Sequence, residues 1–198
     1  PYPIDFREVD TAHSTKIFEN QKVEVWTIPL LHRVPATGWL FREKIKPRSM
    51  RAEKILEYTI PYALIPGIKA GNDLVLPDGR IIPNTELTSS PPAPLAYAFC
   101  SDTAPSPLVV DAVRGVDLLY HEATFTNEHI QEAAISFHST AEQAAKVAAQ
   151  AGVGQLLIGH FSGRYADTEV LLAEARAVFE NTRVVEAGDI IELGDFEK

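Results

Sequence analysis

Apolar and polar residues follow two different spacings along this chain, and the change between them divides the sequence into two regions. In the first region, short apolar or alternating segments predict strands at residues 4–9, 16–18, 23–31 and 37–42. From residue 95 onwards strands alternate with helices: the strands are predicted at 95–100, 116–120, 156–158, 183–186 and 190–193, and the helices at 107–114, 139–151 and 167–179. Repeated strand–helix pairs of this kind predict an α/β fold.

The helix predicted at 139–151 has the most regular pattern in the chain. Alanines recur along one side of it at helical spacing (Ala141, Ala144, Ala145, Ala148 and Ala151). Ser139 and Glu142 fit an S-x-x-E capping box at its start. Gly152 fits the left-handed residue that ends many helices. Because alanine is small, this helix should lie close to a sheet and fix the loops on either side of it.

A basic segment follows the first group of strands. Its cations are Arg42, Lys44, Lys46, Arg48, Arg51 and Lys54. These residues fit either a solvated surface or a local patch that binds phosphate groups. A helix is predicted at 50–58, a hairpin at 74–82 around the turn Pro77-Asp78-Gly79, and an irregular loop at 83–94.

Composition narrows the class of protein. The net charge of −9 argues against non-specific binding of nucleic acid unless basic residues cluster locally. A single cysteine, Cys100, excludes an internal disulfide and fits a reducing cytoplasm. No apolar run reaches the length of a membrane span, so no membrane partner is expected. The chain begins with Pro1, and we expect that residues precede it in the parent protein.

Four residues of metal-ligand or acid–base type stand at or just after the ends of predicted strands. They are His32, Asp102, Glu122 and His160. Strand carboxyl ends meet along one edge of an open α/β sheet, and ligand sites form there. Imidazole and carboxylate groups are the ligands of hydrolytic zinc sites. Each residue alone fits an ordinary loop or cap, whereas four in equivalent places favour a shared site. His13 and His129 lack this context and are expected at the surface.

Several short motifs together resemble one family. The sequence contains His-Glu-Ala-Thr-Phe at 121–125, His-Ser-Thr at 138–140 and His-Phe-Ser-Gly-Arg-Tyr at 160–165. Ala-Phe-Cys-Ser-Asp-Thr at 98–103 and Leu-His-Arg-Val-Pro at 31–35 precede them. In this order and spacing they resemble ribonuclease Z, the endonuclease that processes the 3′ end of tRNA. The likeness runs from about residue 23 to the C-terminus.

The resemblance implies a metallo-β-lactamase-like αββα four-layer sandwich, with two zinc ions at its rim. By the same resemblance, His32 binds one zinc, His160 binds the other and Asp102 bridges both. Glu122 and His138 correspond to the pair that protonates the leaving group. Arg164 is a candidate for contact with a tRNA phosphate, and a structural ion pair is the alternative. A homodimer is expected from the family alone, and a cytoplasmic location fits the single cysteine.

One departure concerns the metal site. The family's remaining ligands lie in a His-x-His-x-Asp-His motif near its N-terminus, and no such motif occurs in this sequence. We therefore expect residues 1–198 to be the C-terminal two-thirds of a single metallo-β-lactamase domain, with an insertion at about 42–94. Three ligands cannot hold two zinc ions, so the isolated chain should be inactive and only partly loaded with metal.

A second departure concerns the segment that binds tRNA in the family. A long glycine- and proline-rich arm is expected there, but residues 57–71 lack that run. The basic segment lies just before it. Arg48 and Arg51 are therefore candidates for contact with the precursor tRNA.

The sequence thus favours a zinc-dependent endoribonuclease that removes the 3′ trailer of tRNA precursors. One alternative keeps the fold and metals but acts as a phosphodiesterase on small substrates. Another is a non-catalytic fragment that binds RNA or a partner protein.

Overall fold

The computed structural model describes residues 3 and 5–193 of the chain. It divides into two compact units, one formed by residues 1–43 with 95–198 and the other by residues 44–94. Each unit has its own hydrophobic core. No helix in the described part of the chain is long and apolar enough to cross a membrane.

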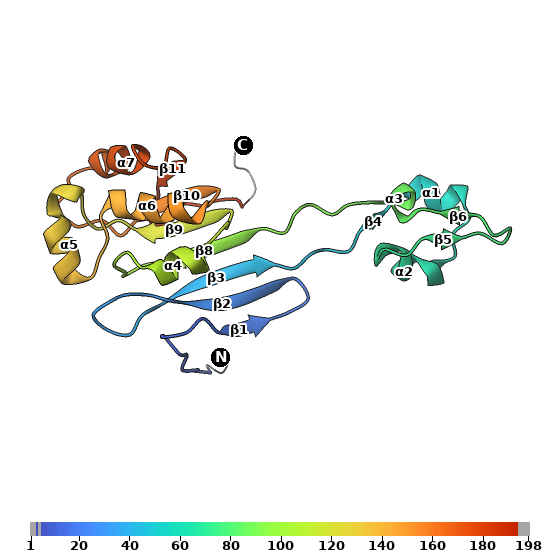
Figure 1. The fold of residues 1–198 in the computed structure, drawn as a ribbon, viewed down its shortest axis with the longest axis horizontal. Helices are drawn as coiled ribbons and strands as arrows, with labels where there is room; N and C mark the ends of the chain where they lie inside the picture. Colours follow the sequence, from blue (N-terminus) through green and yellow to red (C-terminus); the bar gives the residue numbers. More distant parts are fainter. Residues whose placement is uncertain (1–2, 4, 194–198) are drawn as a thin grey trace. The chain divides into compact units, whose positions relative to one another are not determined.

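The first unit is built on a seven-stranded mixed sheet in the order β1-β2-β3-β8-β9-β10-β11 (Figure 1). The first four strands of this order pair in antiparallel fashion, and β8 to β11 pair in parallel. The strands span Lys16–Glu19 (β1), Val23–Pro29 (β2), Thr37–Glu43 (β3), Ala96–Cys100 (β8), Leu118–Glu122 (β9), Gln155–Gly159 (β10) and Thr182–Val184 (β11). The mixed sheet with flanking helices confirms the predicted α/β class.

Two predicted strands are wrong. Residues 5–9, the described part of the segment 4–9, form no strand, and neither do residues 190–193. Phe6 and Ile190 are 90% and 89% exposed, so the alternating pattern there faces solvent instead of a neighbouring strand. Alternation alone does not make a strand, because a ladder needs a partner for its backbone groups.

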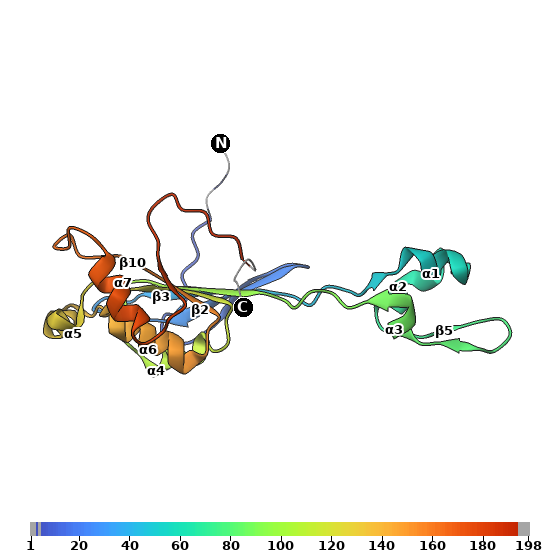
Figure 2. The ribbon, with the colours of Figure 1, turned by 90° about the horizontal axis from the view of Figure 1, so that it is seen from above.

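Helices cover one face of this sheet. They are α4 (Pro107–Ala112), α6 (Ala141–Ala151) and α7 (Glu169–Arg176), and Figure 2 shows α4 and α6 on the same side of the strands. The short helix α5 (Ile130–Ser136) precedes α6 in the chain. The five alanines predicted along one side of α6 are fully or almost fully buried in one core with Leu119, Leu156 and Ile158. Fully burying a leucine or isoleucine side chain stabilises the fold by about 1.5–3 kcal/mol, and an alanine methyl group contributes less.

The other face of the sheet is aromatic and partly exposed. Phe99 and Tyr120 stack with ring centroids 4.6 Å apart, and Phe41 and Tyr97 stack at 5.9 Å. Phe41 is 38% exposed. Burial raises the pKa of Tyr97 to about 12.

The start of α6 differs from its prediction. The capping box is formed by Thr140 and Gln143: the Thr140 hydroxyl accepts from the Gln143 amide, and the Gln143 side chain accepts from the Thr140 amide. Ser139 is not the cap, because its hydroxyl donates to the carbonyl of Thr103 at 2.7 Å. The predicted end is confirmed, since Gly152 has φ 64° in the left-handed region.

The second unit, residues 44–94, consists of short elements around a small core. They are β4 (Ser49–Met50), α1 (Ala52–Glu57), η1 (Tyr62–Leu64), α2 (Ile65–Lys69), β5 (Leu74–Val75), β6 (Ile81–Ile82), α3 (Asn84–Leu87) and β7 (Thr88–Ser89). The predicted helix within 50–58 and the hairpin within 74–82 are confirmed. The irregular loop predicted at 83–94 is wrong in part, because α3 and β7 lie there. Asn84 ties this segment to the unit's core by donating to the carbonyl of the buried Ile68.

Candidate metal and acid–base site

The candidate site lies at one edge of the seven-stranded sheet. His32 follows β2, Asp102 follows β8 and His160 follows β10, while Glu122 is the last residue of β9. The strands β2, β8, β9 and β10 run in the same direction, so their carboxyl ends meet at this edge. His138 reaches the same place from the loop between α5 and α6.

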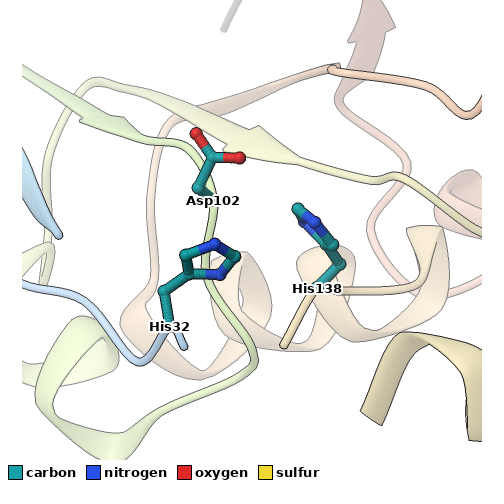
Figure 3. A group of neighbouring side chains, drawn as sticks. All are labelled: His32, Asp102 and His138. Carbon is teal, nitrogen blue, oxygen red and sulfur yellow. The ribbon is translucent and has the colours of Figure 1, made fainter. Parts of the chain in front are cut away.

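Five side chains approach one another there. The ligand atoms of His32, Asp102 and His138 lie within 4.8 Å of one another, as do those of Glu122, His138 and His160 (Figure 3 shows the first group). The His138 ring stands between the other two imidazoles, 5.2 Å from His32 and 5.4 Å from His160 between centroids. The carboxylate of Asp102 lies 3.4 Å from Nε2 of His160.

Glu122 is fully buried and accepts five hydrogen bonds. Three come from backbone amides, and two come from side chains of residues that also shape the site. The donors are the amides of Thr103, Ser139 and Thr124, the Thr124 hydroxyl and His138 Nδ1. A buried carboxylate is costly unless such donors surround it, so this network fixes the orientation of Glu122.

The hydrogen bonds also define which imidazole nitrogens are free. His138 Nδ1 lies 2.7 Å from the carboxylate of Glu122, and His32 Nδ1 lies 3.1 Å from the carbonyl of Phe137. Both partners are acceptors, so both Nδ1 atoms carry hydrogen. Neutral His32 therefore has its lone pair on Nε2, the arrangement that metal-binding histidines adopt.

The backbone around the site is strained. Asp102, Phe137 and His160 have φ of 59°, 61° and 61°, and Thr59 is the one other non-glycine residue in the described chain with a positive φ. A left-handed conformation costs a non-glycine residue about 1–3 kcal/mol and persists only where its surroundings impose it. Two of the strained residues, Asp102 and His160, are predicted metal ligands, and the third, Phe137, accepts the hydrogen bond of His32.

The donor set fits a divalent transition metal. Two imidazoles and one carboxylate are ligands that zinc accepts, and an imidazole nitrogen and a carboxylate oxygen face each other at 3.4 Å. Asp102 has ligand atoms near both His32 and His160, so each of these histidines could hold an ion together with Asp102. His138 is adjacent, but its Nδ1 is engaged by Glu122.

Arg164 lies beside this site, in the loop after β10. Its guanidinium is 4.8 Å from the centre of the Phe125 ring, and its Nε donates to the Ser162 hydroxyl. Phe125 in turn lies edge-on to His138, with centroids 6.4 Å apart. The arginine is exposed and rests on an aromatic ring next to the candidate proton donor.

Arg48 and Arg51 lie in the second unit. Arg48 donates to the hydroxyls of Thr88 and Ser90 at 2.6 and 3.1 Å, and Arg51 donates to the carbonyl of Thr88. Both arginines therefore hold β7 in place with part of their hydrogen-bonding capacity. Each guanidinium has five N–H donors, so groups remain available for other acceptors.

Three neighbours of the site were not identified from the sequence. They are Thr103, Thr124 and Ser139, all of which bind Glu122. Each lies within two residues of a predicted site residue in one of the short motifs, and this closeness in the sequence is the available signal. Their roles depend on contacts between distant segments, which local spacing does not reveal.

The other histidines have different surroundings. His13 is 81% exposed and pairs with Asp10, as expected for a surface residue. The His129 side chain is 29% exposed and contacts Glu132 at 3.2 Å. His121 is fully buried on β9, where its Nδ1 donates to the carbonyl of Glu122, and burial lowers its pKa.

Comparison with known proteins relates the chain to ribonuclease Z. A ribonuclease Z of Porphyromonas gingivalis is 48% identical over 182 residues, which is 92% of this chain and 60% of the relative. The chain thus spans about 60% of the length of this curated relative and corresponds to part of it. A search of protein-family models found no match.

Two solved structures share the fold. Human tRNase Z, short form, superposes with a TM-score of 0.53 at 20% identity, covering 91% of this chain and 47% of that one. A metallo-beta-lactamase fold protein of Bacillus subtilis, YhfI, gives a TM-score of 0.55 at 15% identity, covering 91% and 53%. The expected metallo-β-lactamase fold is thereby confirmed, with the first unit forming a mixed sheet and its flanking helices.

Proposed function

We propose that this chain, which corresponds to part of ribonuclease Z, belongs to a zinc-dependent endoribonuclease that removes the 3′ trailer of tRNA precursors. The observation that best supports this function is the 2.7 Å contact between buried Glu122 and His138, which lies beside three residues of metal-ligand type. Hydrolysis of a phosphodiester within RNA needs a positioned acid to protonate the leaving ribose oxygen, and such a pair supplies one.

The metal would be held by the three predicted ligands. His32, Asp102 and His160 are the residues that would hold the zinc. Zinc ions in such a site polarise the phosphoryl group and lower the pKa of bound water. The chain alone offers these three ligands, so we expect incomplete loading and no activity unless further ligands come from elsewhere in the whole protein.

His138 acts as the general acid. In its protonated form, Nδ1 donates to Glu122 and Nε2 carries the proton for the leaving oxygen. When the phosphorus–oxygen bond breaks, that proton moves to the departing 3′ oxygen and leaves a neutral imidazole. Glu122 keeps the ring oriented throughout and balances its positive charge.

The RNA would be bound by exposed cations. Arg164 stands beside the acid–base pair, and its support on Phe125 limits the conformational freedom lost when it binds a phosphate. Arg48 and Arg51 would contact the precursor tRNA from the 44–94 unit, which we interpret as an insertion within a single domain. The likeness to ribonuclease Z favours a homodimer in the cytoplasm.

The test compares two substrates in the whole protein loaded with zinc. The proposal expects cleavage of a precursor tRNA with a 3′ trailer, and a loss of about 10²–10⁴-fold in His138→Ala. Turnover of a small aryl phosphodiester without RNA cleavage would instead establish a phosphodiesterase. Binding of RNA without turnover of either substrate would establish a non-catalytic binding protein.

A further inference from the structure

We propose that Thr124 is a positioning residue that fixes the tautomer of His160 and connects this metal ligand to the Glu122–His138 pair. The inference deepens the proposed function and rests on it for its catalytic meaning. Its structural content, the hydrogen-bonding state of His160, stands on the contacts alone.

The Thr124 hydroxyl lies between the two halves of the site. Its oxygen is 2.7 Å from Oε2 of Glu122, 3.1 Å from Nδ1 of His160 and 3.0 Å from the carbonyl oxygen of His160. The residue is only 7% exposed. The Thr124 carbonyl also accepts from the amide of Ser162, which holds the loop containing His160 beside it.

The single hydroxyl proton can be assigned from these distances. Oε2 of Glu122 is an acceptor that receives three hydrogen bonds, and a 2.7 Å contact to it requires a donor. A hydrogen bond to a carboxylate is also stronger than one to a backbone carbonyl. The proton of Thr124 therefore points to Glu122, and its oxygen is left as an acceptor.

This assignment determines the state of His160. A hydroxyl oxygen that accepts at 3.1 Å from Nδ1 requires the hydrogen of neutral His160 to be on Nδ1. Its Nε2 then carries the lone pair, and this atom faces Oδ1 of Asp102 at 3.4 Å. Two acceptors that face each other at this distance repel unless a cation lies between them, so His160 is prepared as a metal ligand.

The same hydroxyl links two functions. Oε2 of Glu122 is bound by Thr124, while Oε1 of the same carboxylate is bound by His138. Loss of the Thr124 hydroxyl therefore removes one donor from Glu122 and the Nδ1 acceptor of His160 together. The effect should be larger on metal binding at His160 than on the fold, because the threonine backbone contacts remain.

The test uses nitrogen NMR of the histidine rings and zinc titration against a competing chelator. In the parent protein without metal, neutral His160 should be protonated on Nδ1. Thr124→Val, which keeps the shape, should lose this preference and bind zinc about 10–100-fold more weakly, while Thr124→Ser should restore both. Thr126→Val is the matched control, since Thr126 is equally buried but contacts Tyr165.

Three results would overturn the inference. They are an Nε2-protonated His160 in the parent protein, an unchanged zinc affinity in a folded Thr124→Val, or an equal loss in Thr126→Val. If Thr124→Val does not fold, the parent tautomer and Thr124→Ser still decide the question. If the tautomer and zinc results hold but no variant or parent cleaves precursor tRNA, the proposed function fails and the positioning role remains.

Discussion

His138 donates its Nδ1 hydrogen to Oε1 of Glu122 across 2.7 Å, and this carboxylate is completely buried while the imidazole is 17% exposed. One partner is thus fixed inside the protein and the other reaches the surface of the site. This asymmetry suits a proton donor whose orientation must be held while its outer nitrogen meets a substrate.

The first prediction concerns this pair as a unit. Glu122→Ala and His138→Ala should each lower cleavage of precursor tRNA by about 10²–10⁴-fold. The double variant should be little worse than the more damaging single one, because groups that act together are strongly non-additive. Single-turnover cleavage rates measure this, and fully multiplicative losses would show that the two residues act independently.

Glu122→Ala should also lower the free energy of unfolding, and His138→Ala should lower it less. Removing the carboxylate leaves buried amides without acceptors, at about 1–3 kcal/mol for each unsatisfied group. Urea unfolding separates this effect from catalysis. Cleavage rates should therefore be compared at a temperature where every variant is shown to be folded.

The second prediction concerns acid sensitivity and His121. Burial lowers its pKa, so the folded state keeps this histidine neutral when the unfolded chain takes up a proton near pH 6.5. The unfolded state then binds more protons, and stability falls as the pH drops below that value, by up to about 1.4 kcal/mol per pH unit. Stability at higher pH is unaffected by this group.

The measurement is urea unfolding at pH 7, 6 and 5. His121→Asn should flatten the loss, because the asparagine amide can still donate to the carbonyl of Glu122 but does not titrate. His13→Asn is the control, since His13 is 81% exposed and its substitution should leave the pH profile unchanged. An equal slope in parent and His121→Asn would contradict the prediction.

The third prediction separates the observed cap of α6 from the alternative pairing. Thr140→Ala should cost about 1 kcal/mol, because the Gln143 amide loses its acceptor. Glu142→Ala should cost much less, since Glu142 pairs with exposed Lys146 on the helix surface. Urea midpoints compare the two, and a larger loss in Glu142→Ala would restore the predicted capping box.

This helix shows where sequence reasoning succeeds and where it stops. The alanine spacing and Gly152 defined α6 because helical periodicity and a left-handed cap are local properties. Ser139 and Thr140 are both good capping residues, and the choice between them depends on Thr103, which lies far away in the chain. Local pattern alone could not decide it.

The candidate site follows the same division. The apolar pattern predicts that His32, Asp102, Glu122 and His160 lie at strand ends. Strands that run in the same direction bring those ends together, so the sequence also predicts that the four residues share a site. The pairing of Glu122 with His138 is implied by the family resemblance. The role of Thr124 follows only from its hydrogen bonds to Glu122 and His160 in the structure. Two-residue strands such as β4 and β7 are too short to leave a periodic pattern, so the sequence does not predict them.

The last prediction concerns RNA binding by the 44–94 unit. The double change Arg48→Glu with Arg51→Glu should weaken binding of precursor tRNA, because guanidinium groups that neutralise phosphates release bound counterions. The slope of log affinity against log salt should become shallower by about one for each phosphate contact removed. Affinity measured over a series of salt concentrations gives this slope directly.

Arg80→Glu is the matched control for charge. Arg80 lies in the same unit and is exposed, but its Nε pairs with Asp78 at 2.7 Å. Arg80→Glu should therefore change the slope of log affinity against log salt by less than half of the change in the double variant, which carries two substitutions. Because Arg48 and Arg51 also hold β7, thermal unfolding must show that the double variant is folded. A folded double variant with an unchanged slope would remove both arginines from the RNA interface and leave Arg164 as the cation to test.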